Sequence, residues 1–235
     1  MFPFVYRIDS FGWMHLVNFG VFIPLLAVLG RKRMMPSHGP LPDRGRHLRH
    51  TAFGATAFGG MSLFIAHVEG MDLFPRAFSW VGAMAGIVVL AAAVAGMRPR
   101  WRRAVAANVR VVHLYMPSTV RERAWWIAVA FLAGAGEEIT WRGVQWALLA
   151  NLTGSYSLAA LLCAVMFGVA HMVQGWRTAV VIVGFSLAFH LLVWIAGSLY
   201  VAMAVHIAYD VMAGLTYGRL GRELGYAPAV EAPAG

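Results

Sequence analysis

Long apolar runs separated by short polar segments dominate this chain of 235 residues. Each run is close to the ~20 apolar residues that a helix needs to cross a hydrocarbon layer about 30 Å thick. The runs cover residues 11–30, 51–70, 78–97, 124–150, 157–174, 178–197 and 199–217. The pattern predicts an all-α protein, a polytopic bundle of about seven transmembrane helices.

The composition agrees with this pattern. Hydrophobic residues make up 60% of the chain and charged residues 12%, and the mean hydropathy is +0.67. Soluble domains average about 45–50% apolar and about 25% charged residues, so we expect a membrane domain with no soluble domain attached. Only Arg7 precedes the first apolar run and no small-residue cleavage site follows it, which favours a span over a removable signal peptide. The single cysteine, Cys163, excludes an intrachain disulfide.

The net charge of +9 is distributed unevenly along the chain. If residues 31–50 face the cytoplasm, the alternation of spans places residues 98–123, residues 175–177 and the C-terminal tail on the same side. These segments hold 16 of the 19 Lys and Arg residues, and such an excess is typical of cytoplasmic loops. The N-terminus is therefore predicted outside and the C-terminus inside. The basic segments are expected to contact the anionic lipid of the bilayer and not nucleic acid.

Ionisable groups within the spans gather in the C-terminal half. We expect residues 1–123 to form about three membrane helices with basic loops, residues 124–217 a catalytic four-helix core, and residues 218–235 a short cytoplasmic tail. A charged side chain at the centre of a spanning helix costs about 2.5–3.5 kcal/mol, so it should face protein or water and have a partner. The groups in question are Glu137, Glu138, Arg142, His171, His190, His206 and Asp210.

Helical spacing assigns some of these partners. Glu138 and Arg142 are four residues apart with the acid first, which is the favourable order for an ion pair on one helix face. Glu137 points about 100° away from Glu138 and needs a partner on another helix. His206 and Asp210 are again four apart. Small residues flank these groups, as in "AGAG" before Glu137, and small side chains let membrane helices approach closely.

The ordered set of motifs resembles the CPBP family, which comprises the type II CAAX prenyl endopeptidases and the bacterial Abi or bacteriocin-processing proteins. The matching motifs lie on successive predicted spans, and the resemblance covers roughly residues 124–217. The motifs are Glu137-Glu138-x-x-x-Arg142, Phe167-x-x-x-His171 and His206-x-x-x-Asp210. The chain departs from the well-known eukaryotic members at Asp210, where those carry asparagine.

The resemblance implies an intramembrane endopeptidase. By analogy, Glu137 and His171 would hold and deprotonate a water molecule, and His206 would face the developing oxyanion. Arg142 would hold Glu138, and Phe167 belongs to the supporting set. We expect Asp210 to orient His206, because an ionised carboxylate cannot donate to an oxyanion.

Other interpretations use the same residues. Glu137, His171 and His206 together with an open position would suit a catalytic zinc ion, although metal-free glutamate chemistry is the preferred prediction. A non-enzymatic immunity or scaffold protein, or a proton-coupled transporter, are the remaining alternatives. His190, which matches no motif, is expected to be a hydrogen-bonded packing residue, as are His15 and His67.

For the substrate we predict only a chemical class: a membrane-embedded or membrane-tethered peptide tail, such as a sorting signal or a bacteriocin leader. The composition, rich in Ala, Arg and Gly, points to a bacterial source and hence to the inner membrane. No sequence feature indicates a prenyl-binding groove.

The charge asymmetry predicts the result of a topology experiment. Reporter fusions placed after Lys32 and at Gly235 should both give cytoplasmic signals, because both points adjoin segments rich in Lys and Arg. Alkaline phosphatase and fluorescent-protein fusions measure this directly. Opposite locations for the two reporters would contradict the arrangement of seven spans.

Overall fold

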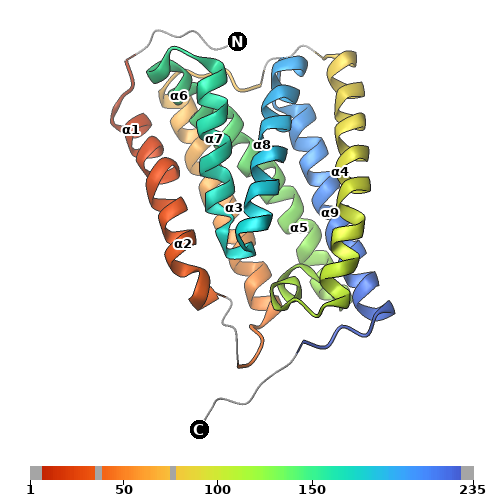
Figure 1. Ribbon diagram of the computed structural model, residues 1–235. Helices are drawn as coiled ribbons and strands as arrows, with labels where there is room; N and C mark the ends of the chain where they lie inside the picture. The colour runs from red at the N-terminus through yellow and green to blue at the C-terminus, as the bar shows by residue number, and fades with distance from the viewer. Residues whose placement is uncertain (1–6, 35–38, 75–77, 229–235) are drawn as a thin grey trace.

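The computed structural model describes residues 7–34, 39–74 and 78–228, and every regular element within these ranges is helical. Seven consecutive helical segments run up and down through one bundle (Figure 1). The first three are α1 (Ser10–Val17) continued by η1 (Asn18–Phe22) and α2 (Ile23–Met34), then α3 (Arg44–Val68), then α4 (Trp80–Ala106). The last four are α5 (Val120–Glu137) continued by η3 (Glu138–Gln145) and α6 (Trp146–Thr153), then α7 (Tyr156–Ala170), α8 (Trp176–Ala196) and α9 (Tyr200–Glu223). Short 3₁₀ turns, η2 (Arg110–Tyr115) and η4 (Met172–Gln174), complete the fold.

Each predicted span coincides with one of these segments, so the prediction of a helical membrane bundle is confirmed. Within the described ranges, four helical stretches are long and apolar enough to cross a membrane by length and composition: Ser10–Arg31, Arg44–Val68, Trp80–Ala106 and Trp176–Ala196. Helix α7 is apolar but only 15 residues long. The segments that carry Glu137–Arg142 and His206–Asp210 contain charged groups, which lower their hydropathy.

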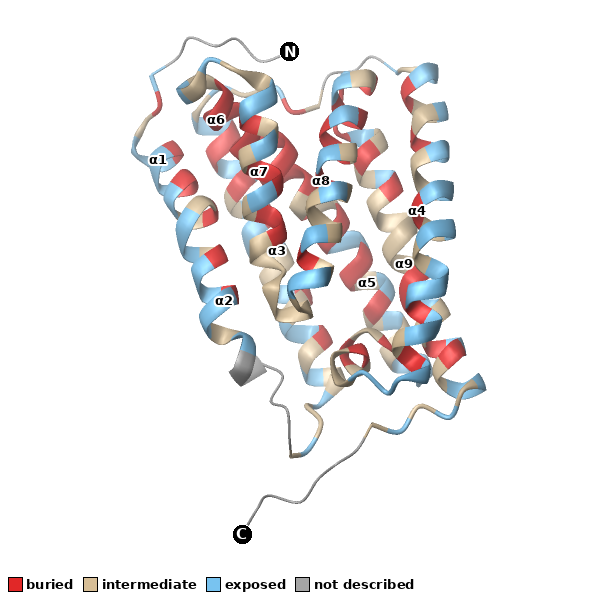
Figure 2. Ribbon diagram, in the orientation of Figure 1, coloured by how far each residue is buried: buried red, intermediate tan, exposed pale blue. Residues whose placement is uncertain are grey.

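Large apolar side chains cover the outer faces of the bundle. Phe53 and Trp80 are each 78% exposed, and Leu29 is 68% exposed. Exposed residues lie on the outward sides of α2 and α4, whereas buried residues gather where the helices face one another (Figure 2). Such a surface would be an aggregation hazard in water and is suited to lipid. The chain is an integral membrane protein.

Helix ends are set by local signals that the sequence carries. Thr119 and Glu122 form a reciprocal capping box at the start of α5. The hydroxyls of Ser79 and Ser155 accept hydrogen bonds from backbone N–H groups in the first turns of α4 and α7. Gly154 and Gly197 end α6 and α8 with φ of 64° and 68°, a conformation that glycine adopts without a steric penalty. These caps hold the segments at fixed lengths.

The C-terminal ends of α2, α4 and α9 lie at one end of the bundle (Figure 1). At that end a partly buried latch, centred on Arg44 and Glu122, ties the start of α3 to the start of α5. Arg44 donates to the carbonyl of His113 at 2.6 Å, to the hydroxyl of Ser118 at 2.9 Å and to the carboxylate of Glu122 at 2.9 Å. Burial opposes the charge of Glu122, but hydrogen bonds from Ser118, Thr119 and Arg44 outweigh it and lower the pKa of Glu122 to about 2.

This latch predicts an acid-sensitive contribution to stability. Because the folded state lowers the pKa of Glu122, the stabilisation is present above the unfolded pKa and is lost as the pH falls towards about 2. Glu122→Gln should therefore lower the melting temperature at pH 7, with a difference from the wild type that shrinks below about pH 4.5. Thermal unfolding in detergent at several pH values measures it. Glu223→Gln is the control, because Glu223 pairs with Arg219 at an exposed site and such pairs contribute little.

Candidate active site

The centre of the bundle is the π-helical turn η3, which continues α5 without a break. All eight of its residues, Glu138 to Gln145, are buried. A π-helix bonds residue i to residue i+5 and is frequent at functional sites, because it alters which side chains share a face. The turn carries the two charged residues that the sequence singles out, Glu138 and Arg142.

Glu138 and Arg142 form the predicted ion pair. The Nη1 of Arg142 donates to Oε1 of Glu138 at 3.1 Å, and the two side chains are 0% and 1% exposed. The guanidinium lies 4.5 Å from the ring centroid of Phe167 and 5.4 Å from that of Phe189. Phe167 thus takes the supporting position that its motif predicts, through a cation–π contact from α7.

The same oxygen of Glu138 also accepts a hydrogen bond from α9. The Nδ1 of His206 lies 2.7 Å from Oε1 of Glu138. Glu138 therefore holds the Nδ1 side of the ring. That Asp210 orients His206 stays a prediction. Asp210 lies on the other side, with Oδ2 3.7 Å from Nε2 of His206. Sequence reasoning missed the Glu138–His206 bond because 68 positions separate the two residues.

The second glutamate occupies the accessible side of the cluster. The side chain of Glu137 is 30% exposed, against 0% for Glu138, which agrees with the predicted 100° separation of the two. The Oε2 of Glu137 lies 3.8 Å from Nε2 of His206. Asp210 is 27% exposed. The Nε2 of His206 therefore faces two partly exposed carboxylates, while its Nδ1 faces the buried one.

His171 is placed less closely than expected. It caps the C-terminus of α7, its Nδ1 lies 2.8 Å from the carbonyl of Phe167, and its ring packs edge-on against that of Phe167 at 4.5 Å. Because a carbonyl only accepts, Nδ1 carries the hydrogen and Nε2 is left as a base. In the described residues no hydrogen bond or ion pair joins His171 to Glu137 or His206. Phe167 lies between His171 and the cluster, since its ring contacts both His171 and the guanidinium of Arg142.

The side chains considered as zinc ligands do not form a metal-binding group among the described residues. No group of three His, Cys, Asp or Glu side chains within residues 7–34, 39–74 and 78–228 is arranged to hold a metal ion. Of the three ligands considered for zinc, His206 directs Nδ1 at Glu138, and His171 directs Nδ1 at the carbonyl of Phe167.

His190 differs from its expected role as a hydrogen-bonded packing residue. It is 3% exposed, and neither ring nitrogen has a hydrogen-bond partner among the described residues. Its ring packs edge-on against that of Trp146 at 5.0 Å. His190 is thus a buried packing residue, but the hydrogen bonds expected for its ring are absent among the described residues.

Glycines set how closely the helices that carry the site approach. A Cβ atom on Gly134 of α5 would lie 2.7 Å from Cγ1 and 3.0 Å from the backbone nitrogen of Ile207, the neighbour of His206. A Cβ on Gly136 would lie 3.0 Å from the carbonyl oxygen of Ala55 in α3. The "AGAG" stretch thus lets α9 and α3 approach the backbone of α5 just before Glu137, as small residues do in membrane proteins.

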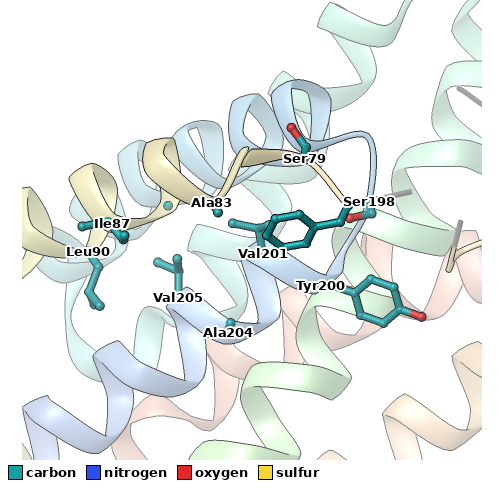
Figure 3. A pocket seen from close by; sticks show the side chains of 11 residues that line it. Ser79, Ala83, Ile87, Leu90, Ser198, Tyr200, Val201, Ala204 and Val205 are labelled. Atoms are coloured by element: carbon teal, nitrogen blue, oxygen red, sulfur yellow. The ribbon is translucent and has the colours of Figure 1, made fainter. Parts of the chain in front are cut away.

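A separate cavity of about 570 Å³ lies between α4 and α9. Its wall is mostly apolar, and Val201 and Val205 of α9 project into it (Figure 3). None of the charged site residues lines it. Although Val205 precedes His206, the cavity lies on a different face of α9 from the cluster.

Fold and site together define a polytopic helical membrane protein with a glutamate–arginine–histidine cluster built on a central π-helix. Comparison with protein-family models then relates the chain to known proteins. Residues 119–212 match the family described as type II CAAX prenyl endopeptidase Rce1-like. The match includes all three motifs and agrees with the resemblance to the CPBP family that the motifs carry, so residues 119–212 are similar to that family. No curated protein and no solved structure matches the chain significantly.

The close approach at Gly134 gives a testable prediction. Gly134→Ala should separate α9 from α5 and lower stability, because extra methyl groups in a packed site typically cost about 1–3 kcal/mol. The matched control is Gly96→Ala in α4, where a Cβ would meet nothing within 4 Å. There alanine should be neutral or stabilising by about 1 kcal/mol or less, since it favours the helix. Melting temperatures in detergent compare the two, and equal values would contradict the tight contact.

Proposed function

We propose that this protein is an intramembrane endopeptidase that hydrolyses a peptide bond in a membrane-embedded or membrane-tethered substrate. The observation that carries the proposal is the pairing of a partly exposed carboxylate, Glu137, with the ring of His206, which Glu138 holds from behind. The two adjacent glutamates thereby take different tasks. Glu138 is buried with Arg142 and positions the imidazole, whereas Glu137 is accessible to water.

The proposed reaction proceeds by general-base catalysis. Glu137 takes a proton from a water molecule, and the water oxygen attacks the carbonyl carbon of the substrate. His206 carries both ring hydrogens in this step, so that Nδ1–H donates to Glu138 and Nε2–H stabilises the oxyanion. Glu137 then returns the proton to the leaving nitrogen as the C–N bond breaks, which yields a carboxylic acid and an amine.

His171 and Asp210 complete the proposed site. His171 presents a free Nε2, because its Nδ1–H is held by the carbonyl of Phe167. In the proposed reaction this nitrogen accepts a hydrogen bond from the water molecule that Glu137 activates. Asp210 places a second accessible carboxylate beside Nε2 of His206, where it can accept from the attacking water or from a substrate N–H group.

We further propose a membrane-tethered peptide tail, such as a sorting signal or bacteriocin leader, as the substrate class. The protein would lie in a bacterial inner membrane with its N-terminus outside. The apolar outer surface of the bundle supports this, because the bilayer would hold such a substrate beside the helices that carry Glu137 and His206. The prenylated tail named by the family description is one member of that class to be tested.

The two glutamates should respond differently to substitution. Glu137→Gln keeps the shape of the side chain but removes the base, so cleavage should fall about 10²–10⁴-fold while the melting temperature stays close to that of the wild type. Glu138→Gln leaves Arg142 without its charge partner, and breaking a buried pair costs about 3–5 kcal/mol. It should therefore lower both yield and melting temperature, and the double change Glu138→Gln with Arg142→Met should recover part of the stability.

The assay is mass-spectrometric detection of cleavage in a panel of tethered tails: a lipidated tail, a sorting signal and a bacteriocin leader, each in proteoliposomes. An active Glu137→Gln variant would show that the base is assigned wrongly. If none of the tails is cleaved by the wild type, a scaffold function is favoured. Activity that withstands a chelator supports the metal-free mechanism, whereas loss that zinc restores supports the zinc-dependent version.

A further inference from the structure

A second polar network lies on another face of η3 and is wholly buried. The Nδ1 of His15 in α1 lies 2.9 Å from Oε1 of Gln145, and its Nε2 lies 3.1 Å from Oγ of Ser62 in α3. The hydroxyl of Ser62 is in turn 2.9 Å from that of Thr140. Exposure is 0% for His15, Ser62 and Gln145 and 1% for Thr140. The network thus joins two N-terminal helices to the π-helical turn.

The hydrogen bonds of this network have one consistent direction. The Oε1 of Gln145 can only accept, so Nδ1 of His15 donates to it and Nε2 is free to accept from the hydroxyl of Ser62. Ser62 then accepts from the hydroxyl of Thr140. A neutral imidazole satisfies all of these bonds, and a satisfied buried network restricts its members to one arrangement.

The two attachment points are five residues apart on η3. A π-helix bonds i to i+5, and its wider turn brings residues with that spacing near one another on one face. Thr140 and Gln145 therefore face α1 and α3, while Glu138 and Arg142 face α7, α8 and α9. Phe19 adds an edge-on contact to Trp141 at 5.6 Å, between the two attachment points.

We propose that His15 is a positioning residue for the site, and that it acts by holding both ends of the π-helical turn. It binds Gln145 directly and Thr140 through Ser62, so the turn cannot revert to α-helical spacing and rotate Glu138 away from His206. His15 and Ser62 lie outside residues 119–212, the part that matches the family. The N-terminal helices thereby contribute to the geometry of the site. The expected effect on catalysis rests on the proposed function, whereas the expected effect on the hydrogen bond of His206 does not.

The test removes single members of the network and observes His206. The variants are Thr140→Val, Ser62→Ala and His15→Phe, in protein with ¹⁵N-labelled histidine rings in lipid nanodiscs. The Nδ1 resonance of His206 is assigned by its loss in His206→Gln. Each variant should shift this resonance, because a displaced Glu138 changes the hydrogen bond that Nδ1 makes. Thr140→Ser retains the hydroxyl and should restore the wild-type signal.

Matched controls remove similar groups elsewhere. Thr56→Val deletes a hydroxyl on α3 that donates to the Ala52 carbonyl of its own helix at 2.9 Å. His190→Phe removes a buried histidine whose nitrogens have no partner among the described residues. Both should leave the Nδ1 resonance of His206 unchanged.

Kinetics on whichever tethered tail the wild type cleaves provide the second measurement. The network variants should lower kcat about 10- to 100-fold with little change in KM, since small misplacements of catalytic groups reach that size. Lower melting temperatures with an unshifted His206 signal and an unchanged kcat would overturn the proposal and leave a purely structural network. If the wild type cleaves no tail, the proposed function fails while the resonance still decides the positioning role. If His15→Phe does not fold, the two hydroxyl deletions decide it.

Discussion

The carboxylate of Glu138 is the constraint on which the rest of this structure depends. A charge within a membrane bundle must be paired, and this one shares a single oxygen between Arg142 of its own turn and His206 of the last helix. The guanidinium in turn lies against rings from α7 and α8. Four of the helical segments are thus fixed around one buried acid. Its second oxygen, Oε2, is buried and accepts no hydrogen bond from the described residues.

Backbone proximity makes this arrangement attainable. The Glu138–His206 bond of 2.7 Å requires α5 and α9 to lie almost in backbone contact, and Gly134 against Ile207 provides that approach. On the other side, Gly136 against Ala55 and Gly59 does the same for α3. Lipid offers no hydrophobic driving force for helix association, so close packing and interhelical hydrogen bonds must supply it. The glycines before the glutamates and the polar groups after them therefore stabilise the same contacts between helices.

The family match covers residues 119–212, but the surroundings of the π-helical turn include α1 and α3. A π-helical turn is less favourable than an α-helical one unless neighbouring groups stabilise it. The chain supplies such groups on both faces of η3, with charged partners on one and a hydrogen-bonded network on the other. This division explains why the first half, which carries few charges within its spans, still bears polar residues at positions such as His15 and Ser62.

The sequence by itself determined the helices, their order and their lipid-facing character, since apolar run length and local caps are properties of contiguous residues. It also determined the Glu138–Arg142 pair and the separation of Glu137 from Glu138, because both follow from helical periodicity. Only the tertiary structure decided that Glu138, and not Asp210, holds Nδ1 of His206, that His171 lies apart from Glu137, and that His15 bonds to Gln145. Periodicity relates residues of one helix, whereas contacts between helices depend on where they cross and how each is rotated. At Glu138 the backbone hydrogen bonds change from α to π spacing, and this change alters how the following residues are rotated. No single residue of the sequence signals the change.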